Sequence, residues 1–356
     1  MKVIHILTGI RFSVLIRLLA RNSICIYPQY FLKLFVLFYN AFFSSVLTRV
    51  ERKLFSASVR KTTLDKPPVF IIGHWRTGST YLHQLISLDP QFTTPSMVQT
   101  VIPDHFLFST KYYVPLMKLL MPKKRPMDEV VLSPEEPQED EFALIRMGSE
   151  SPLEKLIFPP KHEYFLKYYD EYIPKGEKLI SWENNLMTFY KKITLMTGER
   201  IISKNPFHTM RISLLAAMFP GAKLIYIVRH PFEVIPSTIK MWNAVAADNS
   251  LNRYWKKPEI ADVASVLRSF DDYVEIEKQH LDEHNFAEVR FENLEHDPVS
   301  EIKRIYSILH LEFSSVFEKN INQFLILNRK YRKNTYRLTE EEKNLIRQCM
   351  GEKMQE

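Results

Sequence analysis

The chain alternates short, continuous apolar runs with longer stretches in which apolar residues recur every three or four positions. Residues 69–72 form such a run, strand-like segments at residues 200–203 and 223–228 each contain one, and residues 286–291 are also strand-like. Short continuous runs are typical of strands that are buried on both faces. Helical patterns follow at residues 81–88, 211–219, 262–280, 299–309 and 339–349. The alternation predicts an α/β fold in which helices flank both faces of a parallel sheet.

The N-terminal segment, residues 1–60, has a different pattern in which single basic residues interrupt apolar runs. Its longest apolar stretch, residues 35–47, contains polar residues and is shorter than the roughly 20 residues that a spanning helix needs. Arg11 and Arg17 break the apolar region and no small-residue cleavage site follows, which disfavours a signal peptide. Two interpretations remain: helices that pack on the protein, and helices that lie on a membrane surface.

The remaining chain, residues 61–356, is expected to form a single domain. Its middle part, residues 92–197, is helix-rich and aromatic, contains many prolines and lacks repeats. An insertion of this kind between strand units is a usual place for an acceptor pocket or a lid, and an elaboration that only adds packing explains it equally well.

Charge is distributed unevenly along the chain. The net charge is +7, but residues 1–60 carry nine basic side chains and one acidic side chain, so the rest of the chain is close to neutral. This asymmetry argues against nucleic-acid binding by the main domain and indicates an anionic membrane surface as a partner of residues 1–60.

Cysteine usage bears on the compartment. The two cysteines, Cys25 and Cys349, lie near opposite ends of the chain and lack the spacing of metal ligands. Neither a disulfide framework nor a zinc site is therefore expected. We expect a cytoplasmic protein, with a peripheral position on the inner face of the membrane if residues 1–60 bind lipid.

A glycine-containing octet, residues 73–80, follows the first predicted strand. Its spacing is that of the nucleotide P-loop, GxxxxGK[ST], except that Ser79 stands where the loop lysine is expected. Backbone N–H groups and a helix N-terminus would still surround an anion, and Arg76 within the loop offers a planar fork to phosphate or sulfate oxygens. The candidate donor-binding residues of the loop are Arg76, Thr77, Gly78, Ser79 and Thr80.

A second candidate anion site follows the strand at residues 223–228. Arg229 comes directly after this strand, and Ser237 lies eight residues further on, in the next predicted helix. The carboxyl ends of parallel strands share one edge of a sheet, so both side chains could converge there on an anionic ligand.

With these elements in this order, the chain resembles the sulfotransferases that use 3′-phosphoadenosine 5′-phosphosulfate (PAPS). The resemblance rests on residues 70–85, 203–228 and 229–237, and is thinner at residues 289–294 and 334–338. It extends to the branch that includes tyrosylprotein sulfotransferases and lipid-modifying bacterial enzymes. It implies a P-loop-like sulfotransferase fold, PAPS bound by the first loop and by Arg229 with Ser237, and no metal.

The resemblance also implies a catalytic lysine, Lys204, just after a predicted strand. Its ammonium group would stabilise the leaving oxygen while Arg76 holds the sulfonate. The general base is less clear, because the protein-tyrosine branch uses a glutamate upstream of an Ile-Pro step and residues 96–103 contain no acid.

Three residues are the main candidates for that base, and His208, four residues after Lys204, is a weaker one because such a histidine is more often a structural polar contact. His105 could act with Asp104 orienting it, and Glu139 or Glu141 in the acidic run that follows could act instead. The acids near residues 133–136 also have a structural interpretation, since Ser133, a proline and two glutamates fit a capping box at a helix start. A site that uses none of the three is the remaining alternative.

The expected acceptor is a hydroxyl group of an apolar molecule, either a steroid or sterol or another lipid alcohol such as a quinol, as in the bacterial enzymes that the chain resembles. Two other functions stay open at this stage. One is an NTP-dependent P-loop kinase, which the serine at position 79 disfavours. The other is a membrane-peripheral nucleotide-binding protein without catalysis.

Overall fold

The computed structural model describes residues 4–22, 28–120, 133–167, 173–328 and 336–354. The chain forms two compact units: unit 1 comprises residues 1–64, 95–198 and 243–257, and unit 2 comprises residues 65–94, 199–242 and 258–356. Cys349 is a free thiol, and Cys25 lies outside the described residues.

Unit 2 is built on a parallel sheet in the order β2-β3-β1-β4-β5. Its strands are β1 (Val69–Ile72), β2 (Phe92–Thr93), β3 (Arg200–Lys204), β4 (Lys223–Val228) and β5 (Phe286–Arg290). The parallel sheet predicted from the apolar runs is confirmed. Strand β2 was not predicted, because two residues are too few to carry a periodic signal.

One face of this sheet is covered by helices that share a core with β1. Val69 and Ile71 of β1 pack in a cluster with Leu82, Leu85 and residues of the later helices. These helices are α3 (Ser79–Ile86), α12 (Phe291–His296), α13 (Pro298–Ile308) and α14 (Ser315–Leu327). All four residues of β1 are buried, which is why its sequence shows no alternation.

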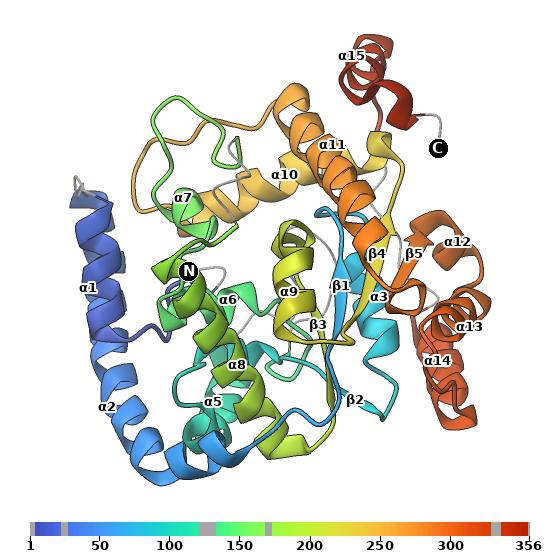
Figure 1. The fold of residues 1–356 in the computed structure, drawn as a ribbon. Helices are drawn as coiled ribbons and strands as arrows, with labels where there is room; N and C mark the ends of the chain where they lie inside the picture. Colours follow the sequence, from blue (N-terminus) through green and yellow to red (C-terminus); the bar gives the residue numbers. More distant parts are fainter. Residues whose placement is uncertain (1–3, 23–27, 121–132, 168–172, 329–335, 355–356) are drawn as a thin grey trace. The chain divides into compact units, whose positions relative to one another are not determined.

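The other face of the sheet meets a second group of helices. Phe70 of β1 contacts the rings of His208 and Phe219, at centroid distances of 5.6 and 5.9 Å. The elements on this side are η3 (Pro206–Arg211), α9 (Ile212–Met218) and α11 (Ile260–Glu277), which contact one another, and Figure 1 shows α9 and α11 in front of the strands. Helix α10 (Pro231–Asn249) follows β4, and α15 (Glu340–Met350) packs against α11. Helices on both faces, as predicted, are thus confirmed.

Unit 1 is helical. Its helices are α1 (Phe12–Arg21), α2 (Phe31–Lys61), α4 (Met97–Val101), α5 (Phe106–Leu120), α6 (Glu141–Met147), α7 (Leu153–Ile157) and α8 (Glu177–Thr197). Helix α2 packs against α1, α5 and α8, and α6 packs against α4 and α8.

Helix α2 is longer than the N-terminal apolar stretch that the sequence indicated, residues 35–47. The polar residues expected to interrupt it are accommodated within a continuous helix of 31 residues. Asn40 Oδ1 accepts a hydrogen bond from the Gly9 N–H at 2.7 Å, and the Ser45 hydroxyl donates to the Ala41 carbonyl at 2.8 Å. By length and composition alone, Pro28–Lys61 could cross a membrane, with a mean hydropathy of 1.6 over its most apolar window and 28% of that window buried.

Three buried histidines make stability sensitive to mild acid. Burial lowers the pKa of His5, His74 and His105 from the ordinary 6.5 to about 4. Between pH 6.5 and 4 these histidines are therefore protonated in the unfolded chain but not in the folded chain. The contribution of the neutral histidines to the free energy of unfolding is complete above pH 6.5 and is lost as the pH falls toward 4. We expect the free energy of unfolding in urea to fall by about 1.4 kcal/mol per pH unit for each histidine in this window. His5→Gln should reduce that slope, and a pH-independent free energy of unfolding would contradict the prediction.

Candidate functional site

The three loops that carry the predicted donor and catalytic residues lie at one edge of the unit 2 sheet. Strands β3, β1 and β4 are adjacent and parallel, and the register pairs Ile71 with Lys204 and Ile72 with Tyr226. The residues after β1, the last residue of β3 and the residue after β4 are thus side by side. The chain leaves β1 toward β2 and β3 but leaves β4 toward β5, and such a switch point is where ligands bind in open parallel sheets.

The loop after β1 needs glycine at two positions. Gly73 has φ 135°, and a Cβ there would lie 2.5 Å from the Ile227 carbonyl oxygen. Gly78 has φ 95°, and a Cβ there would lie 2.1 Å from the Phe291 ring. Arg76 also adopts a positive φ, 70°, which is uncommon for a residue with a side chain. The Thr77 hydroxyl donates to the His74 carbonyl at 2.8 Å and holds this conformation.

Gly78→Ala is expected to lower the free energy of unfolding by about 1–3 kcal/mol and to weaken binding of the nucleotide product, because it adds backbone strain and displaces Phe291. Gly221→Ala is the matched control: φ is 80° there, and the added Cβ would meet only Pro67 at an ordinary 3.5 Å. Urea unfolding and calorimetry would measure both effects. Equal losses in the two variants would show that the contact with Phe291 is unimportant.

Ser237 joins the two predicted anion sites. It lies on α10, and its Oγ accepts hydrogen bonds from Arg76 Nε at 2.8 Å and from the Tyr336 hydroxyl at 3.2 Å. These two bonds occupy both acceptor positions of the hydroxyl oxygen, so the Ser237 O–H is left to donate. Among the residues that the structure describes, nothing accepts that proton. An anion is the complementary partner.

Arg229, directly after β4, contacts the same Arg76 that bonds to Ser237. Its Nη1 donates to the Arg76 carbonyl at 3.4 Å, and its guanidinium lies 4.4 Å from the centre of the Phe291 ring. Its Nη2 is 3.3 Å from Glu233 Oε2, while its buried Nε has no partner in the described part of the chain. A bound anion would therefore supply an acceptor to Nε and compete with Glu233.

Two residues of this cluster were missed by sequence reasoning. Tyr336 belongs to residues 334–338, which carry part of the sequence resemblance, but the spacing assigned it no role; Asn334 and Thr335 lie outside the described residues. Glu233, four residues after Arg229 on a helix, could have been found from the i,i+4 spacing of an ion pair.

The other loop residues lie at the start of α3. Ser79 is the first residue of this helix and is buried, and Thr80 follows it half-buried. The helix N-terminus and its unpaired backbone N–H groups favour a negative charge at this point. The structure thus brings the predicted donor-binding residues together in one unit, and their roles in binding remain a prediction.

Lys204 is the last residue of β3, with 6% of its surface exposed. The next residue fixes the chain there: the Asn205 N–H donates to the Ile71 carbonyl at 3.2 Å, and Asn205 Oδ1 accepts from the Phe207 N–H at 2.9 Å. The backbone at Lys204 is therefore tied to β1, the strand that carries the anion-binding loop.

His105, in unit 1, is a buried neutral imidazole. Its Nδ1 is 2.9 Å from Ser109 Oγ, and its Nε2 has no partner among the described residues. Burial, and secondarily the charge of Lys192, lowers its pKa to about 4. The expectation that Asp104 orients it is wrong, because Asp104 Oδ2 instead accepts from Arg11 Nε at 2.6 Å.

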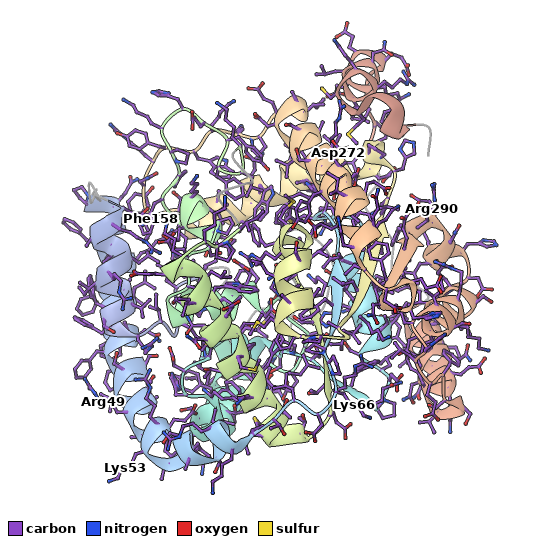
Figure 2. The ribbon with its side chains drawn as sticks, in the orientation of Figure 1. Arg49, Lys53, Lys66, Phe158, Asp272 and Arg290 are labelled. Carbon is purple, nitrogen blue, oxygen red and sulfur yellow. The ribbon has the colours of Figure 1, made fainter. Side chains whose placement is uncertain are left out.

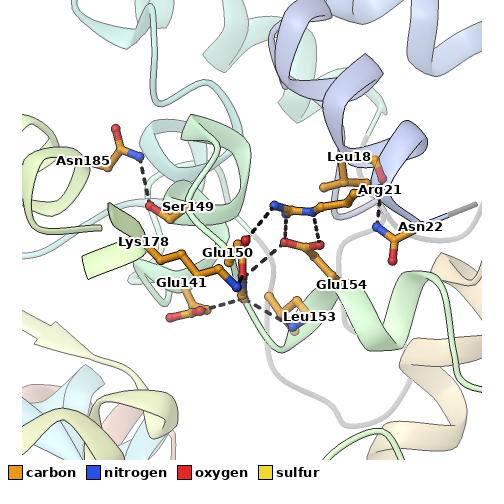
Figure 3. A network of polar contacts seen from close by, with 11 residues as sticks. Leu18, Arg21, Asn22, Glu141, Ser149, Glu150, Leu153, Glu154, Lys178 and Asn185 are labelled. Atoms are coloured by element: carbon orange, nitrogen blue, oxygen red, sulfur yellow. Dashed lines mark hydrogen bonds and ion pairs between the residues drawn. The ribbon is translucent and has the colours of Figure 1, made fainter. Parts of the chain in front are cut away.

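The acidic candidates, Glu139 and Glu141, also belong to unit 1. Glu141, the first residue of α6, is buried and accepts a hydrogen bond from the Ser151 hydroxyl at 2.6 Å, within the polar network that Figure 3 shows. Glu139 is half-buried, and its N–H donates to the Gln138 side chain at 3.0 Å. Glu139, Glu141 and His105 thus stay the predicted candidates for the general base.

The capping box expected at Ser133 is wrong. Residues 134–136 form a turn instead of a helix start, and an isolated bridge between Ser96 and Pro137 follows. The Ser133 hydroxyl bonds locally, donating to the Glu135 carboxylate at 2.6 Å. Serine side chains favour turns for the same reason that they favour helix caps, so the sequence pattern could not separate the two.

Among the described residues, no group of three or more His, Cys, Asp or Glu side chains could hold a metal ion. The candidate site itself consists of cations, hydroxyl groups and the N-terminus of α3, which suit an anionic substrate.

The comparisons with known proteins agree with this architecture. The model of the "Sulfotransferase family" matches residues 67–315. The chain belongs to the sulfotransferase family. It is 31% identical over 348 residues to "Omega-hydroxy-beta-dihydromenaquinone-9 sulfotransferase Stf3" of Mycobacterium bovis and of Mycobacterium tuberculosis, covering 97% of this chain and 88% of the relative. The family implies PAPS as the sulfuryl donor, and the protein is a PAPS-dependent sulfotransferase.

Solved structures show the same fold at low identity. Sulfotransferase STF9 from Mycobacterium avium superposes with a TM-score of 0.67 at 17% identity, covering 87% of this chain and 81% of that one. Sulfotransferase STF1 from Mycobacterium tuberculosis gives a TM-score of 0.62 at 16% identity, covering 97% and 87%. The predicted sulfotransferase fold is confirmed, and the kinase and the non-catalytic alternatives are set aside by the family assignment.

Proposed function

We propose that this sulfotransferase transfers the sulfuryl group of PAPS to a hydroxyl group of a long apolar lipid, such as a hydroxylated menaquinone derivative. The donor half rests on two hydrogen-bond donors that contact Arg76: the Ser237 hydroxyl, which has a proton left to donate, and Arg229, whose Nε has no partner in the described part of the chain. The acceptor half is supported by the name of Stf3, to which the chain is 31% identical over 97% of its length.

The donor residues divide between the two ends of the nucleotide. Arg229 and Ser237 would hold the 3′-phosphate, because each has a donor that lacks a partner among the described residues. Arg76 and the N-terminus of α3 would hold the 5′-phosphosulfate by charge-assisted hydrogen bonds. PAPS supplies the activated sulfuryl group, and the protein's share is to orient it and to offset its charge.

Lys204 acts where negative charge develops. As the acceptor oxygen forms its bond to sulfur, the bond between sulfur and the bridging 5′-phosphate oxygen breaks. The Lys204 ammonium would stabilise that leaving oxygen, which is most negative in the transition state. A base removes the acceptor hydroxyl proton in the same process.

Substitution of each base candidate should identify the residue that removes the proton. Turnover is expected to fall by about 100-fold or more in one of His105→Gln, Glu139→Gln and Glu141→Gln, since general base catalysis contributes factors of this size. Binding of the product nucleotide, measured by calorimetry, should stay unchanged in the same variant. Full activity in all three would mean that none of them is the base.

The acceptor class can be tested with labelled sulfate. Transfer from PAPS is expected to an ω-hydroxylated menaquinone in detergent, whereas a free monosaccharide should receive none. A sterol such as cholesterol, also an apolar alcohol, tests whether the enzyme accepts a rigid ring system. Transfer to the monosaccharide without transfer to any lipid alcohol would overturn the acceptor proposal and leave the donor chemistry intact.

A further inference from the structure

The exposed face of α2 carries a continuous apolar stripe. Leu32, Phe35, Tyr39 and Phe42 are 75, 69, 61 and 57% exposed, and they recur at the three- and four-residue spacing of one helix face. The stripe, completed by exposed neighbours, comprises Phe31, Leu32, Phe35, Val36, Tyr39, Phe42, Phe43 and Val46. It runs for about 22 Å along the helix axis. Exposed apolar patches of this size on a folded protein usually mark an interaction site.

The same helix becomes basic directly beyond the stripe. Arg49, Arg52 and Lys53 are exposed on the following turns, and Figure 2 labels Arg49 and Lys53 on α2. The acid on this helix, Glu51, is buried. Helices that lie on anionic lipid surfaces combine apolar and basic residues on their exposed side in the same way.

Polar contacts hold the opposite face of α2 against the rest of unit 1. The Ser44 hydroxyl donates to the Gly9 carbonyl at 2.7 Å. Glu51 Oε1 pairs with Lys192 Nζ of α8 at 2.5 Å, and both side chains are buried. The Lys192 ammonium also donates to the Pro103 carbonyl at 2.5 Å. Withdrawing α2 to cross a membrane would expose these groups to hydrocarbon, and separating a buried ion pair is strongly unfavourable.

We propose that α2 docks this enzyme on an anionic membrane while lying in the plane of the surface. The apolar stripe enters the boundary between headgroups and acyl chains, and Arg49, Arg52 and Lys53 contact lipid phosphates. A second copy of the chain is a poorer partner for this surface. In a symmetric dimer the same patch of each copy faces the other. The patch has exposed Arg49, Arg52 and Lys53 but no exposed acidic residue to pair with them. The inference goes beyond the proposed function and needs neither donor nor acceptor.

Vesicle flotation tests the docking surface on the full chain. Wild-type protein is expected to float with vesicles of phosphatidylcholine and phosphatidylglycerol, and more weakly with phosphatidylcholine alone. F35S/Y39S/F42S should reduce the bound fraction about tenfold or more by removing apolar burial, and R49Q/K53Q should abolish the preference for anionic lipid. I326S/L327S on α14 removes two equally exposed apolar residues and is expected to change nothing.

The depth of α2 in the bilayer distinguishes a helix that lies in the membrane surface from one that spans the membrane. This measurement does not require the serine variants to fold. In F31W and V46W, at the two ends of the stripe, fluorescence quenching by lipids brominated along the acyl chain should report the same shallow depth. Different depths at the two positions would mean that α2 spans, and no quenching would mean that it does not dock. A third result would assign the surface to a second copy of the chain: the wild-type protein does not bind vesicles but forms a dimer in light scattering, and F35S/Y39S/F42S abolishes that dimer. Each of these three results overturns the proposal.

Discussion

Arg229→Ala is expected to weaken binding of the product nucleotide, 3′-phosphoadenosine 5′-phosphate, by about 2–4 kcal/mol, because it removes a charge-assisted contact from a preformed anion site. The site is preformed because Phe291 supports the guanidinium and the Arg76 carbonyl fixes Nη1. Calorimetry with this nucleotide and with adenosine 5′-phosphate would measure the effect. The wild-type enzyme should discriminate strongly between the two, and the variant should lose that discrimination.

Glu233→Gln provides the matched control for this result. Because Glu233 pairs with Arg229 at 3.3 Å on a partly exposed helix, it competes with the 3′-phosphate for the same guanidinium. Neutralising it should tighten binding of the 3′-phosphorylated nucleotide severalfold and leave adenosine 5′-phosphate unaffected. If Arg229→Ala still discriminates as the wild type does, Arg229 is not the 3′-phosphate ligand.

The strands and the donor cluster could be predicted from the sequence because their signals are local. Residues 69–72 and 224–227 are buried on both faces of the sheet and therefore form continuous apolar runs in the sequence. Arg229 comes directly after β4, and a parallel sheet brings such positions together whatever their distance along the chain. The contact between Arg76 and Ser237, 161 residues apart, follows from this topology.

The remaining features depend on partners that are distant in sequence. Asp104 is adjacent to His105, but it pairs with Arg11, which the helical N-terminal segment supplies. The polar residues at 40, 44 and 45 were expected to leave an apolar stretch too short to span a membrane, and instead they lie within the 31-residue helix α2, where Asn40 and Ser44 bond to Gly9 in the loop before α1. A local pattern does not report which partner satisfies a polar group, so the base and the helix boundaries were the weakest predictions.

The two-residue length of β2 illustrates a further limit. Phe92 and Thr93 pair with Arg200 and Ile201 of β3, and this pairing alone makes them a strand. No periodicity exists in two residues, so only the tertiary structure could define the edge of the sheet.

Lys204→Ala is expected to lower turnover by about 100-fold or more, equivalent to about 2.7 kcal/mol of transition-state stabilisation, while product-nucleotide affinity stays nearly unchanged. Its ammonium is needed chiefly as the bridging oxygen leaves, and its position at the end of β3 places it beside the loop that follows β1. Lys204→Met keeps the apolar stem in this buried position and should show the same loss, which separates charge from packing. Single-turnover kinetics and calorimetry on both variants would measure turnover and affinity. A proportionate loss of nucleotide binding would make Lys204 a ground-state ligand of the donor, and unchanged turnover would exclude it from catalysis.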